Sequence, residues 1–230
     1  MVTGEGSENL RNLLKELSRI EDPLRRRLFV TGVVTKALQM KGVTPILVGG
    51  LAIDFYTFGG YGTVDIDLVA ADRETVKAVL AELGFDKPFG DRNWYLRAEG
   101  IVLEVPDEVL AGSRQRVLQA KVNGLPVYVV GIEDLILDRV GGHAATRSVA
   151  DLDWAVNLAA ARYETLDERY LLREAEVRQV RPLAKKVLAE AKRRLRAVAQ
   201  LDSLGSGEER HDARSRPCQK RNQTQNNRRS

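Results

Sequence analysis

The stretch from residue 44 to residue 69 constrains the fold of this chain more than any other part of the sequence. Ile46-Leu47-Val48 is a short apolar run between a proline and Gly49-Gly50, which is the pattern of a buried strand. The glycine pair leads directly into residues 51–58, where the pattern predicts a helix, and residues 63–69 follow as a second predicted strand. Strands that alternate with helices in this way predict an α/β centre with a partly parallel sheet.

The second predicted strand has two carboxylates on one face. Side chains two residues apart in a strand point the same way, so Asp65 and Asp67 share a face while Ile66 and Leu68 turn toward the core. Two adjacent carboxylates repel each other, and a divalent cation relieves that repulsion because hard cations prefer carboxylate oxygen. The alternative is a pair of ordinary aspartates at a solvated strand end.

A third carboxylate follows in a later predicted strand. Glu104 lies in the apolar run Ile101–Val105, where a charge is costly unless it is compensated. Beside the two aspartates it would complete a site for two metal ions, which clamp the attacking and leaving oxygens in phosphoryl transfer. The alternative for Glu104 is an edge-strand residue that faces water. Asp107 is then the fallback ligand, although it follows Pro106 and suits a turn.

The glycine pair also has a chemical meaning. Glycine lets phosphate oxygens approach backbone N–H groups, and the N-terminus of the following helix adds positive potential. We therefore expect Gly49 and Gly50 to seat a phosphate, unless they only form a tight turn between strand and helix.

The whole chain predicts an α/β (α+β) fold in which a mixed sheet has helices on one side. Asn123-Gly124 is a strong hairpin signal, and from residue 132 onward the apolar spacing is helical. Further helices are predicted at 8–20, 23–40, after Asp72, at 168–178 and at 183–200, and further strands at 93–97, 101–105, 117–122 and 127–130. We expect N-terminal helices in 1–43, the α/β core in 44–130, a C-terminal helical bundle in 131–201 and a disordered basic tail in 202–230.

Composition narrows the class of protein. There is no run of about 18 apolar residues, so no membrane-spanning helix is expected. The one cysteine, Cys218, cannot form an internal disulfide, and a cytoplasmic location is expected. Of the net charge of +4, residues 169–230 contribute +10 and residues 1–168 contribute −6. The basic end permits contact with nucleic acid or an acidic partner, or else it is a solvated helix face.

Two segments of the predicted core resemble a known signature. Val48–Ala52, followed by Gly62–Leu68, resembles the signature of the DNA polymerase β-like nucleotidyltransferase superfamily. More narrowly, the chain resembles the minimal nucleotidyltransferases of toxin–antitoxin systems, including the AbiEii-like group, which pair such a core with a helical C-terminal part. Gly131–Ile136 resembles the segment at which that part begins. The resemblance spans about residues 44–160 and is more specific for the fold than for the substrate.

The resemblance assigns roles to residues of the core. It implies that Asp65, Asp67 and Glu104 are catalytic and bind Mg²⁺ or Mn²⁺. It also implies that the glycine pair contacts the triphosphate of an NTP, and Thr63 of the same signature is assigned to the nucleotide site. The third carboxylate is usually an aspartate in that family, so the glutamate here is a departure.

A second departure lies in the predicted helical part. The AbiEii-like proteins have a lysine followed by an aspartate on the later helices. Here Arg139 occupies the lysine-like place and is expected to help bind the nucleotide, with Asp151 or Asp153 as its acidic partner. Arginine keeps the charge of lysine but cannot accept a proton.

These residues predict the transfer of a nucleoside monophosphate from an NTP such as ATP to a hydroxyl of a protein or RNA acceptor. The resemblance implies a toxin–antitoxin or abortive-infection setting, with a cognate toxin or antitoxin and tRNA or another RNA as partners. The alternative is a non-catalytic antitoxin-like module that contacts a protein or RNA through its basic C-terminal helices. The sequence has no P-loop, HExxH or Ser–His–Asp pattern that would favour another enzyme class.

Overall fold

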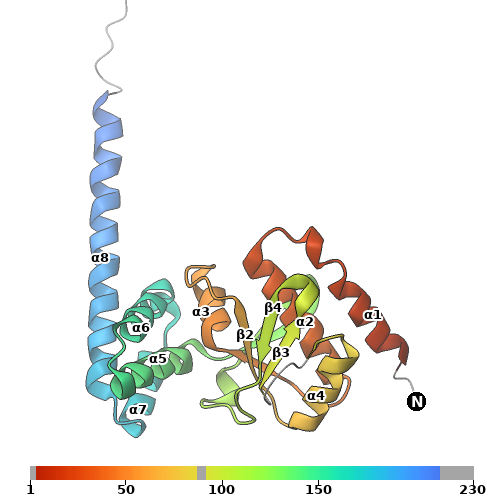
Figure 1. Ribbon diagram of the computed structural model, residues 1–230. Helices are drawn as coiled ribbons and strands as arrows, with labels where there is room; N and C mark the ends of the chain where they lie inside the picture. Colours follow the sequence, from red (N-terminus) through yellow and green to blue (C-terminus); the bar gives the residue numbers. More distant parts are fainter. Residues whose placement is uncertain (1–3, 87–91, 213–230) are drawn as a thin grey trace, which may run out of the picture. The chain divides into compact units, whose positions relative to one another are not determined.

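The computed structural model describes the backbone of residues 4–86 and 92–212, and the side chains of residues 6–86 and 92–200. The chain divides into two compact units, Met1–Ala191 and Lys192–Ser230. The first unit contains the sheet, seven helices and the start of the eighth (Figure 1). Every predicted site residue therefore belongs to one unit.

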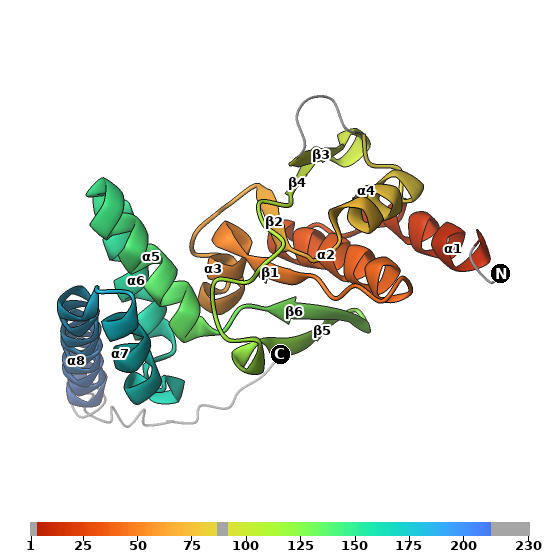
Figure 2. The same cartoon turned by 90° about the horizontal axis from the view of Figure 1, so that it is seen from below.

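The sheet has six strands and mixed direction, as the sequence predicts. Its order is β3-β4-β2-β1-β6-β5, which can be followed in Figure 2. The β1 strand is antiparallel to β2 and parallel to β6, β2 is parallel to β4, and the β3–β4 and β5–β6 pairs are antiparallel. The strands are β1 Ile46–Val48, β2 Asp65–Val69, β3 Asn93–Leu96, β4 Ile101–Glu104, β5 Leu118–Val122 and β6 Leu125–Val129.

The helices begin where the sequence places capping residues. The Asp22 side chain accepts a hydrogen bond from the Arg25 N–H at the start of α2, and Asp72 caps α4 through the Thr75 N–H in the same way. The helices are α1 Gly4–Leu14, α2 Pro23–Gln39, α3 Gly49–Thr57, α4 Arg73–Glu82, α5 Ile132–Thr146, α6 Val149–Ala161, α7 Glu168–Val177 and α8 Arg181–Asp212. Short 3₁₀ turns lie at Leu17–Arg19, Arg97–Glu99, Arg114–Arg116 and Tyr163–Thr165.

The two faces of the sheet have different surroundings. One face is apolar and mostly buried, and its buried residues include Leu47, Ile66, Leu68, Trp94 and Leu103, while Leu118 of the edge strand β5 is exposed. The N-terminal α2 packs on this face closely enough that a Cβ on Gly32 would lie 2.8 Å from the Leu125 Cβ. The other face is half-exposed along β2 and β4, where Asp65, Asp67, Val102 and Glu104 alternate with the buried residues. That face carries the carboxylates, and we call it the carboxylate face.

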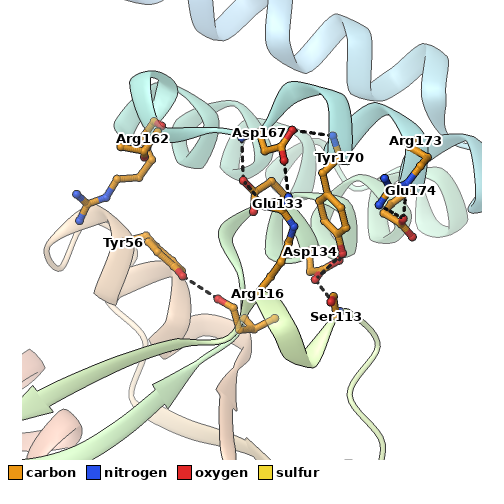
Figure 3. Close-up of polar contacts among 12 residues, drawn as sticks. Tyr56, Ser113, Arg116, Glu133, Asp134, Arg162, Asp167, Tyr170, Arg173 and Glu174 are labelled. Carbon is orange, nitrogen blue, oxygen red and sulfur yellow. Dashed lines mark hydrogen bonds and ion pairs between the residues drawn. The ribbon is translucent and has the colours of Figure 1, made fainter.

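A buried polar cluster joins the helical part to the core. Asp134, in the first turn of α5, accepts hydrogen bonds from the Ser113 N–H (2.9 Å) and the Tyr170 hydroxyl (3.0 Å) (Figure 3). It also accepts one from Arg178 (3.2 Å). Burial and the Asp134 carboxylate raise the pKa of Tyr170 to about 12. The Arg116 guanidinium lies 3.8 Å from the centre of the Tyr170 ring and pairs with Asp167 on the other side. These contacts tie the start of α5 to the segment before β5.

The last helix is longer than predicted. It continues to Asp212, whereas the sequence pattern places a disordered tail from residue 202. Leu201 and Leu204 extend the apolar spacing of Leu195 and Val198, which favours the longer helix. The rest of the predicted tail, residues 213–230, lies outside the described residues. Among the described helices, none is long and apolar enough to cross a membrane.

Candidate functional site

The strand register brings the three predicted carboxylates to one face. Asp67 of β2 is the register partner of Glu104 in β4 and of Val48 in β1, and Asp65 lies two residues before Asp67. Register partners on neighbouring strands lie about 4.8 Å apart and point to the same side of a sheet. Since β4 lies between β2 and β3, Glu104 is not on an edge strand. The three carboxylates therefore face the same half-exposed surface.

The glycine turn lies against the central carboxylate. The Gly50 N–H donates a hydrogen bond of 3.3 Å to Asp67 Oδ2. Burial raises the pKa of the Asp67 carboxyl above its ordinary value, the Gly50 hydrogen bond lowers it, and the charges of Glu104 and Asp65 raise it further. The net effect is a raised pKa, so the folded protein bears a cost for the charged form. A nearby positive charge would therefore stabilise the charged form of Asp67.

Gly49 accepts no side chain, for two independent reasons. Its φ of +62° is in the left-handed region, and an added Cβ would overlap the Asp67 carboxylate, 2.7 Å from Cγ. We expect Gly49→Ala to destabilise the fold by about 2–4 kcal/mol, because it combines backbone strain with a clash at a half-buried carboxylate. The measurement is urea unfolding, with Gly141→Ala in α5 as the control, since a Cβ there would meet nothing within 4 Å. Equal unfolding midpoints for the two variants would contradict this account.

A buried aspartate holds the loop that precedes the two site aspartates. Asp54 of α3 is fully buried, and its Oδ1 accepts hydrogen bonds of 2.8 Å from the N–H groups of Tyr61 and Gly62. Its Oδ2 accepts one of 3.1 Å from the Thr63 N–H, and an Arg27 guanidinium nitrogen lies 3.9 Å away. One side chain therefore fixes the backbone of the loop that enters β2.

Thr63 lies between this loop, the glycine turn and the first aspartate. Its hydroxyl accepts a hydrogen bond of 3.3 Å from the Asp65 N–H. A Cβ on Gly50 would lie 2.9 Å from the Thr63 Cβ and 2.9 Å from the Tyr61 ring, so helix α3 starts in close contact with the loop. Thr63 thus lies beside the glycine turn, where the nucleotide was predicted to bind. Its hydrogen bond to the Asp65 N–H helps to fix the backbone at the start of β2.

Arg139 reaches the same region from α5. Its guanidinium bonds to Asp138 (2.6 Å) and to Asp151 of α6 (3.1 Å), so Asp151 is its partner rather than Asp153. Asp151 can approach because it packs against Gly142, where an added Cβ would lie 3.0 Å from Asp151 Oδ2. Burial lowers the pKa of Arg139, but the hydrogen bond and charge of Asp138 and the charge of Asp151 outweigh that effect and raise it. The guanidinium is therefore a fixed positive charge, and it lowers the pKa of Asp67.

Part of this group of residues lines a hollow of about 370 Å³, whereas Asp65, Glu104 and Thr63 do not line it. It is lined by Gly49, Asp67 and Arg139 on the polar side and by Val69, Leu110 and Leu135 among its apolar residues. We call it the sheet hollow. Larger hollows of about 680 and 610 Å³ lie elsewhere, but neither contains a residue of the carboxylate face. The sheet hollow is therefore the candidate site because of the residues that line it, and not because of its volume.

The donor set fits a hard divalent cation in kind. Asp65, Asp67 and Glu104 supply only carboxylate oxygens, the ligand type that Mg²⁺ and Mn²⁺ prefer. Mutual repulsion and burial already raise the pKa of the central one. In the described part of the chain, however, no three or more Asp, Glu, His or Cys side chains form a ready-made ligand group. The carboxylate face thus has side chains of the right type for metal binding, but they are not arranged around one metal position.

Comparison with known proteins gives fold-level likeness alone. No protein-family model matches the sequence, and no curated protein matches it either. The solved structures that match include a nucleotidyltransferase-like protein and an antibiotic-resistance factor. One is an antigenic nucleotidyltransferase-like protein from Paracoccidioides brasiliensis, with 18% identity over 74% of this chain and 94% of that one, and a TM-score of 0.48.

Two further matches are structures of the antibiotic-resistance factor ANT(2'')-Ia. Its solution structure is 19% identical over 78% of this chain and 94% of that one, with a TM-score of 0.40. Its crystal structure with adenylyl-2''-tobramycin is 15% identical over 68% of this chain and 93% of that one, with a TM-score of 0.44. At such identities and scores, function has to be argued from the residues of this chain.

Two residues of the site, Asp54 and Asn93, were not predicted from the sequence. Asp54 was missed, although a lone carboxylate inside the apolar helix Leu51–Phe58 is itself a signal that it has a buried role. Asn93, the register partner of Glu104 on β3, was missed because only the sheet register reveals it. Asp107 lines the sheet hollow, and its carboxylate accepts the Glu108 and Val109 N–H groups, which matches the turn role expected for it.

Proposed function

We propose that this protein is a metal-dependent nucleotidyltransferase. In the reaction, a hydroxyl oxygen of the acceptor forms a bond to the α-phosphorus of an NTP. The bond from that phosphorus to the oxygen bridging to the β-phosphate breaks, pyrophosphate leaves, and the hydroxyl proton is released. The observation that carries the proposal is the register of Asp67 with Glu104, beside a glycine turn in which the Gly50 N–H donates a hydrogen bond to Asp67.

Residues at different positions of the site would have different roles. Asp65, Asp67 and Glu104 would hold Mg²⁺ or Mn²⁺, which when bound supplies positive charge to the transferring phosphate and to the attacking and leaving oxygens. The glycine turn and Thr63 would seat the triphosphate at the start of α3, where backbone N–H groups and the helix dipole favour anions. Arg139 would add fixed positive charge from the other side of the sheet hollow.

The acceptor and the biological setting form the finer part of the proposal. We propose a protein side chain or an RNA, such as tRNA, as acceptor, in a toxin–antitoxin or abortive-infection system of the AbiEii-like type. The setting rests on the narrower resemblance to the minimal nucleotidyltransferases of toxin–antitoxin systems, in which Gly131–Ile136 resembles the start of the helical part. The cell compartment proposed is the cytoplasm.

A second candidate function is binding without catalysis. The protein would act as an antitoxin-like module that contacts a partner protein or RNA through its basic C-terminal helices. Two observations favour it. The carboxylates are not arranged around one metal position, and exposed basic residues such as Lys185 and Lys186 lie on α8. RNA binding that is absent or insensitive to salt would count against a nucleic-acid role for these helices.

A transfer assay separates the two candidates. The full-length chain is incubated with each of the four NTPs, labelled at the α-phosphate, with Mg²⁺ and total tRNA, and with any partner protein encoded beside it. We expect label to move from one NTP to tRNA or to protein, and to be lost when Asp65→Ala and Asp67→Ala are combined. No transfer with any NTP, or transfer that survives in the double variant, would contradict catalysis.

Arg139 provides a separate prediction. Arg139→Gln should raise the KM for the NTP about tenfold or more, since a hydrogen bond to a charged group contributes roughly 1.5–3 kcal/mol. Arg139→Lys should recover most of that loss, because a single positive charge suffices to face a triphosphate. The control is Arg173→Gln, which removes an equal charge from a residue that is 64% exposed. An unchanged KM in Arg139→Gln would exclude this residue from the nucleotide site.

A further inference from the structure

The end of α3 presents an aromatic side chain to solvent in a strained backbone conformation. Phe58 follows the last residue of α3, its φ is +56°, and its side chain is 79% exposed. The left-handed region suits glycine or asparagine at the end of a helix, whereas a bulky residue is disfavoured there. Because the ring is exposed, its burial within the protein does not offset this strain. A strained and exposed aromatic residue of this kind indicates contact with another molecule.

A guanidinium lies against the same ring. Arg162, at the end of α6, has its guanidinium carbon 4.8 Å from the centre of the Phe58 ring. Figure 3 shows this guanidinium pointing away from the neighbouring Glu133 and Asp167. Among the described residues it forms no ion pair with a carboxylate, and its Nε has no hydrogen-bond partner. The charge of Arg162 is therefore left for an anion from outside the chain.

Arg162 is reached from solvent through a hollow of about 610 Å³, which it lines and which we call the arginine hollow. The exposed residues Gln115 and Thr165 also line it, so an amide and a hydroxyl lie in the same hollow as the guanidinium. The buried Glu133 is a further lining residue, but its carboxylate is paired with Arg116 at 3.5 Å. The arginine hollow thus suits a negatively charged group that also forms hydrogen bonds.

We propose that Phe58 and the arginine hollow bind one nucleotide of a single-stranded RNA, with its base stacked on the Phe58 ring and its phosphate at Arg162. Each nucleotide carries a flat π-face and a negative charge, and aromatic rings beside cationic groups are what single-strand binding proteins use for them. We call this place the RNA subsite. That the bound RNA is also the acceptor rests on the proposed nucleotidyl transfer.

The RNA subsite lies one helix length from the glycine turn. Helix α3 begins at Gly49 and ends at Thr57, and its nine residues rise about 13 Å. The loop after Phe58 leads back to β2 and Asp65. A stacked strand advances about 3.4 Å per nucleotide, so the bound nucleotide would lie about four nucleotides before the end that reacts.

The test is RNA binding by the full-length chain. A fluorescent single-stranded RNA of about 12 nucleotides, three times the expected span, is titrated with protein at several salt concentrations, and its anisotropy is measured. Phe58→Asn should weaken binding about tenfold, because base stacking is lost. Arg162→Gln should weaken it to a similar extent and make the plot of log affinity against log salt less steep by about 0.7. In urea, Phe58→Asn should unfold at the wild-type midpoint or above it, since asparagine adopts the left-handed conformation more readily.

The matched control is Arg173→Gln. Arg173 also lies over an aromatic ring, 5.2 Å from the centre of Tyr170, but it is paired with Glu174. Its replacement should leave the RNA affinity within about twofold of wild type.

The possible results separate the RNA subsite from the proposed function. No RNA binding by the wild type, or wild-type affinity in both Phe58→Asn and Arg162→Gln, would overturn the RNA subsite and leave the Phe58 ring for a protein partner. A loss of binding in Phe58→Asn with a lower unfolding midpoint would show a structural role and also overturn it. RNA binding that depends on both residues, without label transfer from any NTP, would support the RNA subsite and contradict the proposed function.

Discussion

Replacing Asp67 by asparagine is expected to reduce nucleotidyl transfer at least about a thousand-fold, equal to about 4 kcal/mol of transition-state stabilisation. The reason is its place at the centre of the site: it is the register partner of Glu104 and it accepts the Gly50 hydrogen bond. Asparagine keeps the shape and can still accept that hydrogen bond, but it lacks the charge that a divalent cation needs. Single-turnover transfer with labelled NTP measures the effect.

The same variant should lose transfer activity without losing stability when metal is withheld. The pKa of Asp67 is raised in the folded state, so folding favours the protonated form. Stability from that form is present below the ordinary Asp pKa and is lost as the pH rises through the raised value. At neutral pH in EDTA, Asp67→Asn should therefore unfold at the same temperature as the wild type or at a higher one.

A control variant distinguishes the loss of a carboxylate at the site from the loss of a carboxylate elsewhere on the protein. Asp86→Asn removes a carboxylate from an exposed ion pair with Arg97, where the Asp86 side chain is 60% exposed. Its transfer rate should stay within about twofold of wild type, and its stability within about 1 kcal/mol. A transfer rate in Asp67→Asn that matches the Asp86→Asn rate would contradict the role assigned to Asp67.

Replacing Asp54 by alanine is expected to have the largest effect on stability. The side chain is fully buried, accepts three backbone N–H groups of the loop before β2 and lies 3.9 Å from Arg27. Alanine would leave those donors unsatisfied and the Arg27 charge without its partner, and breaking a buried charged pair in this way costs about 3–5 kcal/mol. Transfer should fall as well, since the loop fixes the backbone from which Asp65 projects.

Urea unfolding measures this prediction, with the slope checked to be equal among variants. Asp54→Asn retains one acceptor oxygen and should lose about half as much stability as Asp54→Ala, since hydrogen bonds remain but the charge is gone. Asp86→Ala is the exposed control and should change the free energy of unfolding by less than about 1 kcal/mol. If Asp54→Ala unfolds at the same urea concentration as Asp86→Ala, the loop is held by other contacts.

The local part of the fold follows from the sequence. A buried run before Gly49-Gly50 and the alternation in Asp65–Val69 predict β1, α3 and β2, because strand periodicity and the glycine turn are local properties. The shared face of Asp65 and Asp67 follows from the same periodicity. The mixed sheet was predicted as a class, since hairpin signals and α/β alternation occur in one chain.

The site as a whole depends on contacts that the sequence pattern does not specify. The pairing of Asp67 with Glu104 requires β4 to lie next to β2, and a shift of one residue in that register would turn Glu104 to the buried face. The choice of Asp151 over Asp153 as the partner of Arg139 depends on how α6 packs against Gly142. Such long-range geometry appears only once the strands and helices are assembled.

Calorimetric titration of a non-hydrolysable NTP into the full-length chain tests the central claim most directly, because it needs no acceptor. With Mg²⁺ present we expect saturable binding of at least one of the four nucleotides. The affinity should fall at least about tenfold in EDTA and equally in Asp67→Asn with Mg²⁺, which corresponds to about 1.4 kcal/mol. Binding that is equally tight with Mg²⁺, in EDTA and in Asp67→Asn would contradict a metal-dependent nucleotide site on the carboxylate face.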